Sequence, residues 1–149
     1  MMVWAIVLLT TGVTVAALLR RRIVVVTVTG ISMTPTIQPG NRLLVRRCGI
    51  AGLKIGDIVV LEPPQPYIPD EVTQLVPMRP QPRWNVKRVA ALPGDPIPAQ
   101  AQAATGAARI VPAGSLIVLG DNDEGRDSRQ VGLYPADRIL GVALRTLAV

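Results

Sequence analysis

The side chains through which this chain could do covalent chemistry are hydroxyls, amines and carboxylates. It contains no histidine, and its single cysteine, Cys48, excludes an intrachain disulfide and a thiolate metal site. We therefore expect neither a metal nor a cofactor. The chemistry that remains is a hydroxyl nucleophile activated by a lysine, which can accept the hydroxyl proton only when its own amine is neutral.

Lysine is rare here, since only Lys54 and Lys87 accompany the many arginines among the sixteen basic residues. Lys54 is typical of a solvated turn. Lys87 lies in "NVKRVAAL", where strand alternation places Lys87, Val89 and Ala91 on one face. A lysine on an apolar strand face is either an edge charge or a buried base, and the pattern alone fits both.

One serine stands out in the stretch "VTVTGISMTPTIQPG" at residues 26–40. Ser32 follows a branched aliphatic run and Gly30, which permits close approach of a substrate backbone, and Pro35 fixes the chain beyond it. The amide of Ser32 would be one oxyanion donor if it faced a reacting carbonyl. Residue statistics favour the alternative that Ser32 is a turn or capping serine, so the local pattern leaves both open.

Acidic side chains crowd together in "GDNDEGRD", residues 120–127. General acid–base catalysis by paired carboxylates is conceivable there. The block also carries glycines and has arginines within it and just after it, an arrangement that suits structural ion pairs better. The residues concerned are Asp121, Asp123, Glu124, Asp127, Arg126 and Arg129.

Composition predicts one folded, mostly β domain. The chain has 149 residues, of which 49% are hydrophobic, and its aromatic content of 3% leaves a core of Val, Ile, Leu and Ala. The net charge of +6 could suit nucleic acid or an anionic membrane. Because the basic residues are scattered and no basic aromatic stripe exists, we do not expect a nucleic-acid partner.

The positions of apolar runs and turn residues predict where the elements lie. Strands are expected at 23–29, 42–47, 55–62, 84–92 and 139–147, with one more ending near 119 after a turn at 112–114. Residues 96–108 suit a loop or a weak helix. The segment 63–82 carries seven prolines, too many for a sheet interior, and is expected to be an extended loop.

The first 22 residues predict a single-pass membrane anchor with a basic flank. Residues 3–19 are uncharged and would span about 26 Å as a helix, close to the hydrocarbon thickness of a bilayer. A buried soluble helix is the alternative. Arginines 20–22 follow the run and would draw the body, residues 23–149, into the cytoplasm, so charge alone does not settle the topology.

Four segments, in order, resemble the signature blocks of type I signal peptidases, the membrane-anchored Ser-Lys serine endopeptidases. They are "GISMTPTIQPG", "LKIGDIVVLEPP", "VKRVAALPGD" and "VLGDNDEGRDSRQVGLYP". The resemblance implies an antiparallel, barrel-like β body beside a membrane. It implies removal of signal or leader peptides from exported precursors, a single-pass location in the cell membrane, and an extracytoplasmic catalytic domain.

The resemblance also assigns roles to residues. Ser32 is the nucleophile and Lys87 the general base. Oxyanion and substrate contacts fall on Gly30, Ile31, Met33 and Val86. Structural support of the site falls on Arg88, Asp121, Asp127, Ser128 and Arg129.

Two departures from the family pattern bear on activity. Gly30 stands where some members carry a serine that assists the oxyanion hole, and only "DEGR" separates GDN from DSR. The serine that orients the lysine in other members is thus missing near Gly125. Within the peptidase interpretation, the protein could be a dedicated maturation protease with a narrow substrate range. The alternative is a catalytically impaired, membrane-anchored β-module that binds precursors or a partner protease. A related self-cleaving repressor is less suited, because no room remains for a DNA-binding region.

Overall fold

The computed structural model describes residues 22–64 and 84–147. Apart from Arg22, the predicted anchor lies outside the described residues, as does the Pro-rich loop beyond Pro64, so both stay predictions. Within the described ranges, no helix is both long enough and apolar enough to cross a membrane.

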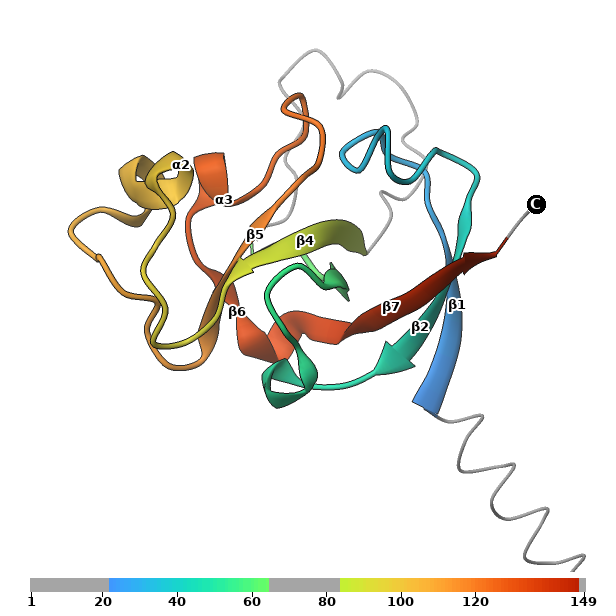
Figure 1. Ribbon diagram of the computed structural model, residues 1–149, viewed down its shortest axis with the longest axis horizontal. Helices are drawn as coiled ribbons and strands as arrows, with labels where there is room; N and C mark the ends of the chain where they lie inside the picture. The colour runs from blue at the N-terminus through green and yellow to red at the C-terminus, as the bar shows by residue number, and fades with distance from the viewer. Residues whose placement is uncertain (1–21, 65–83, 148–149) are drawn as a thin grey trace, which may run out of the picture.

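A curled antiparallel sheet forms the body of the described chain (Figure 1). Its strands follow the order β1-β2-β7-β3-β4-β5-β6, and each pairing between them is antiparallel. The prediction of a mostly β, antiparallel fold is confirmed. The strands are β1 (Ile23–Thr27), β2 (Arg42–Arg47), β3 (Ile58–Leu61), β4 (Asn85–Ala91), β5 (Ser115–Leu119), β6 (Tyr134–Pro135) and β7 (Ile139–Leu147).

Turn chemistry explains the largest difference between the strands and their predicted ranges, the late start of β3. β2 and β7 have the predicted bounds, whereas β3 begins three residues later than expected. The delay arises because Gly56 has a φ of 90°, and the Asp57 side chain accepts a hydrogen bond from the Lys54 amide at 2.9 Å. These contacts close a turn just before the strand.

Two short elements were not predicted, β6 and the helix α3 (Ser128–Val131). Asp127 caps α3 by accepting a hydrogen bond from the Arg129 amide at 2.9 Å, and the Gln130 side chain accepts one from the Asp127 amide at 3.0 Å. This is a capping box, so the Asp-x-x-Gln spacing was a usable signal. The weak helix considered within 96–108 is α2 (Ala99–Gln102). Short 3-10 helices span Ile50–Gly52, Ala103–Thr105 and Ala136–Arg138.

Aliphatic side chains fill the core beneath the segment that carries Ser32. This cluster joins β1, β2 and β7 to the first residues of β4, with the indole of Trp84 packed at its side. Its burial anchors both ends of the segment between β1 and β2. Its buried members are Val28, Met33, Ile37, Leu43, Val45, Val60, Val86 and Leu140.

Candidate active site

Two loops meet at one end of the sheet (Figure 1). The serine loop, residues 28–40, connects β1 to β2, and the acidic loop, residues 120–127, connects β5 to α3. They touch through backbone, because the Asn122 amide donates a hydrogen bond to the Ser32 carbonyl at 3.0 Å. A Cβ built on Gly120 would lie 2.5 Å from the same carbonyl oxygen, so the close approach requires glycine there.

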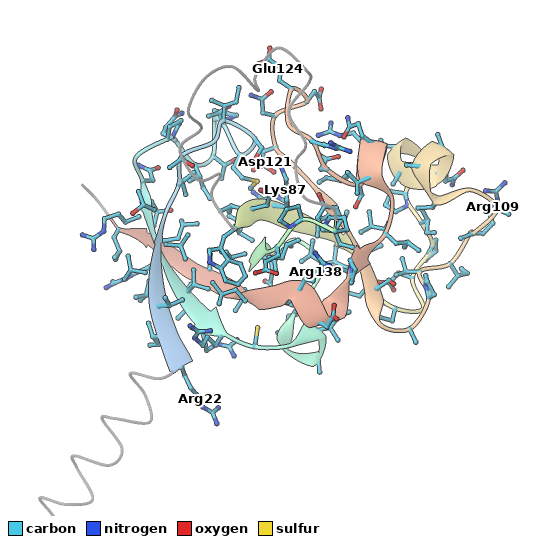
Figure 2. All side chains as sticks on the ribbon, turned by 180° about the vertical axis from the view of Figure 1, so that it is seen from behind. Arg22, Lys87, Arg109, Asp121, Glu124 and Arg138 are labelled. Atoms are coloured by element: carbon cyan, nitrogen blue, oxygen red, sulfur yellow. The ribbon has the colours of Figure 1, made fainter. Side chains whose placement is uncertain are left out.

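Lys87 lies in the middle of β4, beneath the acidic loop (Figure 2). The interpretation of Lys87 as an edge charge is wrong, because β4 is flanked by β3 and β5 and the Lys87 residue is only 3% exposed. Loss of water contacts is the main reason why the pKa of Lys87 falls from 10.5 to about 8. The Asp127 carboxylate opposes this shift, and the Arg129 cation adds to it.

Ser32 is half-buried and faces β4. Its hydroxyl donates a long hydrogen bond of 3.4 Å to the carbonyl of Val86, the residue before Lys87. A Cβ built on Gly125 would lie 2.5 Å from Ser32 Cβ and 3.4 Å from Lys87 Nζ. The structure therefore places Ser32 and Lys87, which lie more than fifty residues apart in the chain, close to the same point beside Gly125.

This close approach explains why residue 125 of the acidic loop is a glycine. Because a side chain at Gly125 would collide with Ser32, the shortened loop has no room for one. In this chain, burial rather than a neighbouring hydroxyl sets the environment of Lys87.

An ion pair fixes the start of the acidic loop. Arg88 donates to both carboxylate oxygens of Asp121, through Nε at 2.8 Å and Nη2 at 2.6 Å, and through Nη1 to the Gly56 carbonyl at 2.9 Å. These bonds lower the pKa of Asp121 and raise that of Arg88. The hydroxyl of Thr36 in the serine loop also helps to lower the pKa of Asp121.

A second ion pair fixes the end of the acidic loop. The fully buried Asp127 accepts hydrogen bonds from the Gly120 amide at 2.6 Å and from Arg129 Nη2 at 2.6 Å. Burial alone would raise the pKa of Asp127, but these bonds outweigh it and hold that pKa low. Arg129 also pairs with Asp123. The buried hydroxyl of Ser128 accepts a hydrogen bond from the Val118 amide at 2.9 Å and so links α3 to β5.

The residues predicted to contact substrate divide into two groups. Gly30 and Ile31 face outward, and Ile31 is 48% exposed. Met33 and Val86 are buried in the core and offer no open surface. Within the described ranges the Ser32 amide N–H has no hydrogen-bond acceptor, so it is available to a bound group.

Three contact residues escaped the sequence analysis, namely Thr34, Thr36 and Asn122. The hydroxyl of Thr34 accepts a hydrogen bond from Asn122 Nδ2 at 3.0 Å, across 88 positions of sequence. No local pattern signals such a contact. Asn122 lies within the block 120–127, but only the acidic and basic residues of that block were given an interpretation. In the part of the chain that the structure describes, no group of three or more His, Cys, Asp or Glu side chains could hold a metal ion.

Comparison with known protein families gives a match over residues 1–105 and 98–147 to the family described as signal peptidase, peptidase S26. The chain belongs to this family of serine peptidases, as the four sequence blocks predicted. Membership supports signal peptidase activity on precursor proteins. A search of curated proteins found no match to the chain.

Proposed function

We propose that this chain is a membrane-bound signal peptidase that cleaves exported precursors with a Ser32–Lys87 dyad. The observation that carries the proposal is that Ser32 and the buried Lys87 lie close to the same point beside Gly125. The Lys87 pKa of about 8 leaves part of its amine neutral near physiological pH. A neutral amine is the form able to take a proton from a hydroxyl.

The reaction then runs in two halves. Lys87 Nζ takes the Ser32 hydroxyl proton as Oγ attacks the scissile carbonyl carbon, and the Ser32 amide N–H stabilises the resulting oxyanion. The carbon–nitrogen bond breaks, and the Lys87 ammonium passes its proton to the leaving amine. Lys87 next takes a proton from water, whose hydroxide attacks the acyl-enzyme ester. Collapse of this second intermediate returns the proton to Ser32 Oγ and releases the new carboxyl terminus.

The substrate is proposed to bind as an added strand. β1 lies at one end of the sheet order, so within the described residues one of its edges has no paired strand and could pair with an extended peptide. Its last residues lead directly into the serine loop, where Gly30 leaves room for a substrate backbone. We further propose, from the family resemblance, substrates with small residues next to the cut and a narrow set of cognate precursors.

We place the body, residues 23–149, outside the cytoplasm on a single-pass anchor formed by residues 1–22. The basis is the uncharged run at 3–19 and the short connection from it to Ser32. Protease protection of a C-terminal tag in spheroplasts tests this topology. A tag digested by added protease is expected, and a protected cytoplasmic tag would contradict the processing of exported precursors.

Cleavage of a panel of precursors, including those encoded near this protein's gene, tests the enzymatic proposal. The full chain is expected to cut at least one, with losses of about a thousandfold or more for Ser32→Ala and Lys87→Ala. Lys87→Arg should be equally inactive, because a guanidinium does not give up its proton. Lys54→Ala, which removes an exposed lysine, is the matched control. A wild type no better than its variants would favour the impaired β-module instead.

A further inference from the structure

The carbonyl of Ile31, just before Ser32, receives more hydrogen bonds than a turn requires. The Thr34 amide donates to it at 3.0 Å, the Thr34 hydroxyl at 2.8 Å and Asn122 Nδ2 at 3.2 Å. Asn122 Nδ2 also donates to the Thr34 hydroxyl oxygen at 3.0 Å. One backbone bond would close the turn, so the two side chains add a constraint of their own.

That constraint acts on the amide of Ser32. A trans peptide is planar with its C=O and N–H pointing in opposite directions, so holding the Ile31 carbonyl also fixes the direction of the Ser32 N–H. Donors on the carbonyl further polarise the peptide and strengthen its N–H as a donor. Within the described residues this N–H has no acceptor.

Asn122 holds the next peptide as well. Its backbone N–H donates a hydrogen bond to the Ser32 carbonyl at 3.0 Å, while its side-chain Oδ1 accepts one from the Glu124 backbone N–H at 3.0 Å. The two peptides on either side of Ser32 are thus tied to one residue of the acidic loop. That residue is itself fixed by its own loop.

From this geometry we propose that Thr34 and Asn122 are positioning residues that aim the Ser32 amide N–H at the oxyanion of the reacting carbonyl. The inference rests on the proposed function, because it takes Ser32 as the nucleophile. Neither side chain touches the substrate in this role. Both act through the orientation of the Ile31–Ser32 peptide.

Steady-state kinetics of the full chain in detergent, on a precursor that the wild type cleaves, tests the inference. Thr34→Val keeps the shape but removes the hydroxyl, and should lower kcat about 10- to 100-fold with KM changed less than about twofold. Thr34→Ser restores the hydroxyl and should recover kcat to within about threefold of wild type. Equal losses of kcat in Thr34→Val and Thr34→Ser would overturn the inference.

A matched control exists elsewhere in the chain. The Thr105 hydroxyl donates to the Gln102 carbonyl three residues earlier at 3.1 Å, the same local contact as in Thr34 but away from the two loops. Thr105→Val should leave kcat within about twofold of wild type. An equal fall of kcat in Thr105→Val would overturn the inference, because loss of such a bond anywhere would then suffice.

Asn122→Asp tests the same contact from the acidic loop and covers the case in which Thr34→Val does not fold. It keeps Oδ1 but replaces the Nδ2 donor with an acceptor, so kcat should again fall with little change in KM. Ser32→Ala separates the two levels of proposal. If Ser32→Ala cleaves like wild type, the proposed function fails and this inference with it. If Ser32→Ala is inactive while Thr34→Val and Asn122→Asp keep wild-type kcat, the inference alone fails.

Discussion

Lys87 is buried, and burial destabilises its charged ammonium form relative to the neutral amine. Its residue is 3% exposed, and the carboxylate of Asp127 that could stabilise its charge is already hydrogen-bonded to Arg129. The net result is the pKa of about 8. The same burial therefore predicts an effect on catalysis and an effect on stability, with different pH windows.

Activity should rise with pH as Lys87 loses its proton. The fraction of neutral amine grows about tenfold per pH unit below about 8 and levels off above it. We expect kcat/KM of the full chain in detergent to rise between pH 6 and 8 and then reach a plateau. Lys54→Met should leave the shape of this profile unchanged. A profile that is flat, or that falls across pH 6 to 8, would exclude Lys87 as the base.

Stability should show the cost of burying the lysine. The folded pKa of about 8 lies below the ordinary 10.5, so the unfolded chain binds more protons between these values, and stability from this group rises with pH there. Below pH 8 the full cost applies, about 3 kcal/mol. Lys87→Met should therefore raise the free energy of unfolding at pH 7 by up to about 3 kcal/mol, and by much less at pH 10.5.

Denaturant unfolding of the full chain in detergent, at both pH values, measures this difference. Lys54→Met is the reference, because it removes an equal charge from an exposed turn. A Lys87→Met protein less stable than wild type at pH 7 would show that the ammonium is stabilised in the fold, contrary to its proposed use as a base.

At the scale of the elements, the sequence predicts the strand that carries Lys87 but not the position of that strand in the sheet. The strand under Lys87 is evident from its alternation, and the burial of Val89 and Ala91 agrees with it. Its position between β3 and β5 is not evident from the sequence, because the local pattern does not say which strands pair. The edge or interior position of Lys87 was therefore undecidable from its own segment.

The acidic loop shows the same division. Its carboxylates were expected to form structural ion pairs, and the contacts of Asp121 and Asp127 with Arg88 and Arg129 are of that kind. The sequence did not reveal the steric contact between the two loops. That Gly125 lies against Ser32 depends on the packing of two loops more than ninety residues apart, which no spacing within either loop encodes.

Gly125→Ala should therefore damage the site more than the fold. The new methyl would lie 2.5 Å from Ser32 Cβ, so the serine or the loop must shift. We expect kcat/KM to fall about 100-fold or more, since small misplacements of reacting groups cost this much. Gly49→Ala is the control, because a Cβ there meets no atom within 4 Å. Wild-type kinetics of Gly125→Ala would mean that Ser32 and Lys87 are not held by this contact.

At the scale of the whole molecule, charge is unevenly distributed. The ten acidic residues all fall between positions 57 and 137, whereas β1, β2 and β7 contain four arginines and no carboxylate. Arg22 lies at the start of β1, at the opposite end of the molecule from Glu124 (Figure 2). The side of the sheet formed by β1, β2 and β7, which follows the predicted anchor, is therefore basic.

One face of this basic side of the sheet also carries exposed apolar side chains. The register places Ile23 opposite Arg46, and Val25 opposite Leu44, which in turn pairs with Arg145. Ile23 and Val25 are 39% and 41% exposed. Exposed aliphatic side chains among arginines suit the headgroup region of an anionic bilayer, where each basic residue contributes about 1 kcal/mol.

This face should rest on anionic lipid when the full chain is reconstituted into vesicles. Amide hydrogen exchange in β1 and β2 should be slower in vesicles with anionic phospholipid than in purely zwitterionic ones, and 0.5 M salt should remove most of the difference, since salt at about this level shortens the Debye length to a few ångströms. Arg42→Gln with Arg46→Gln should abolish it, whereas Lys54→Gln with Arg109→Gln, an equal loss of charge elsewhere, should not. Exchange that is independent of lipid charge would mean that this face does not bind anionic lipid. The arginines of β2 would then serve solubility, because a charged face that lipid does not cover stays hydrated.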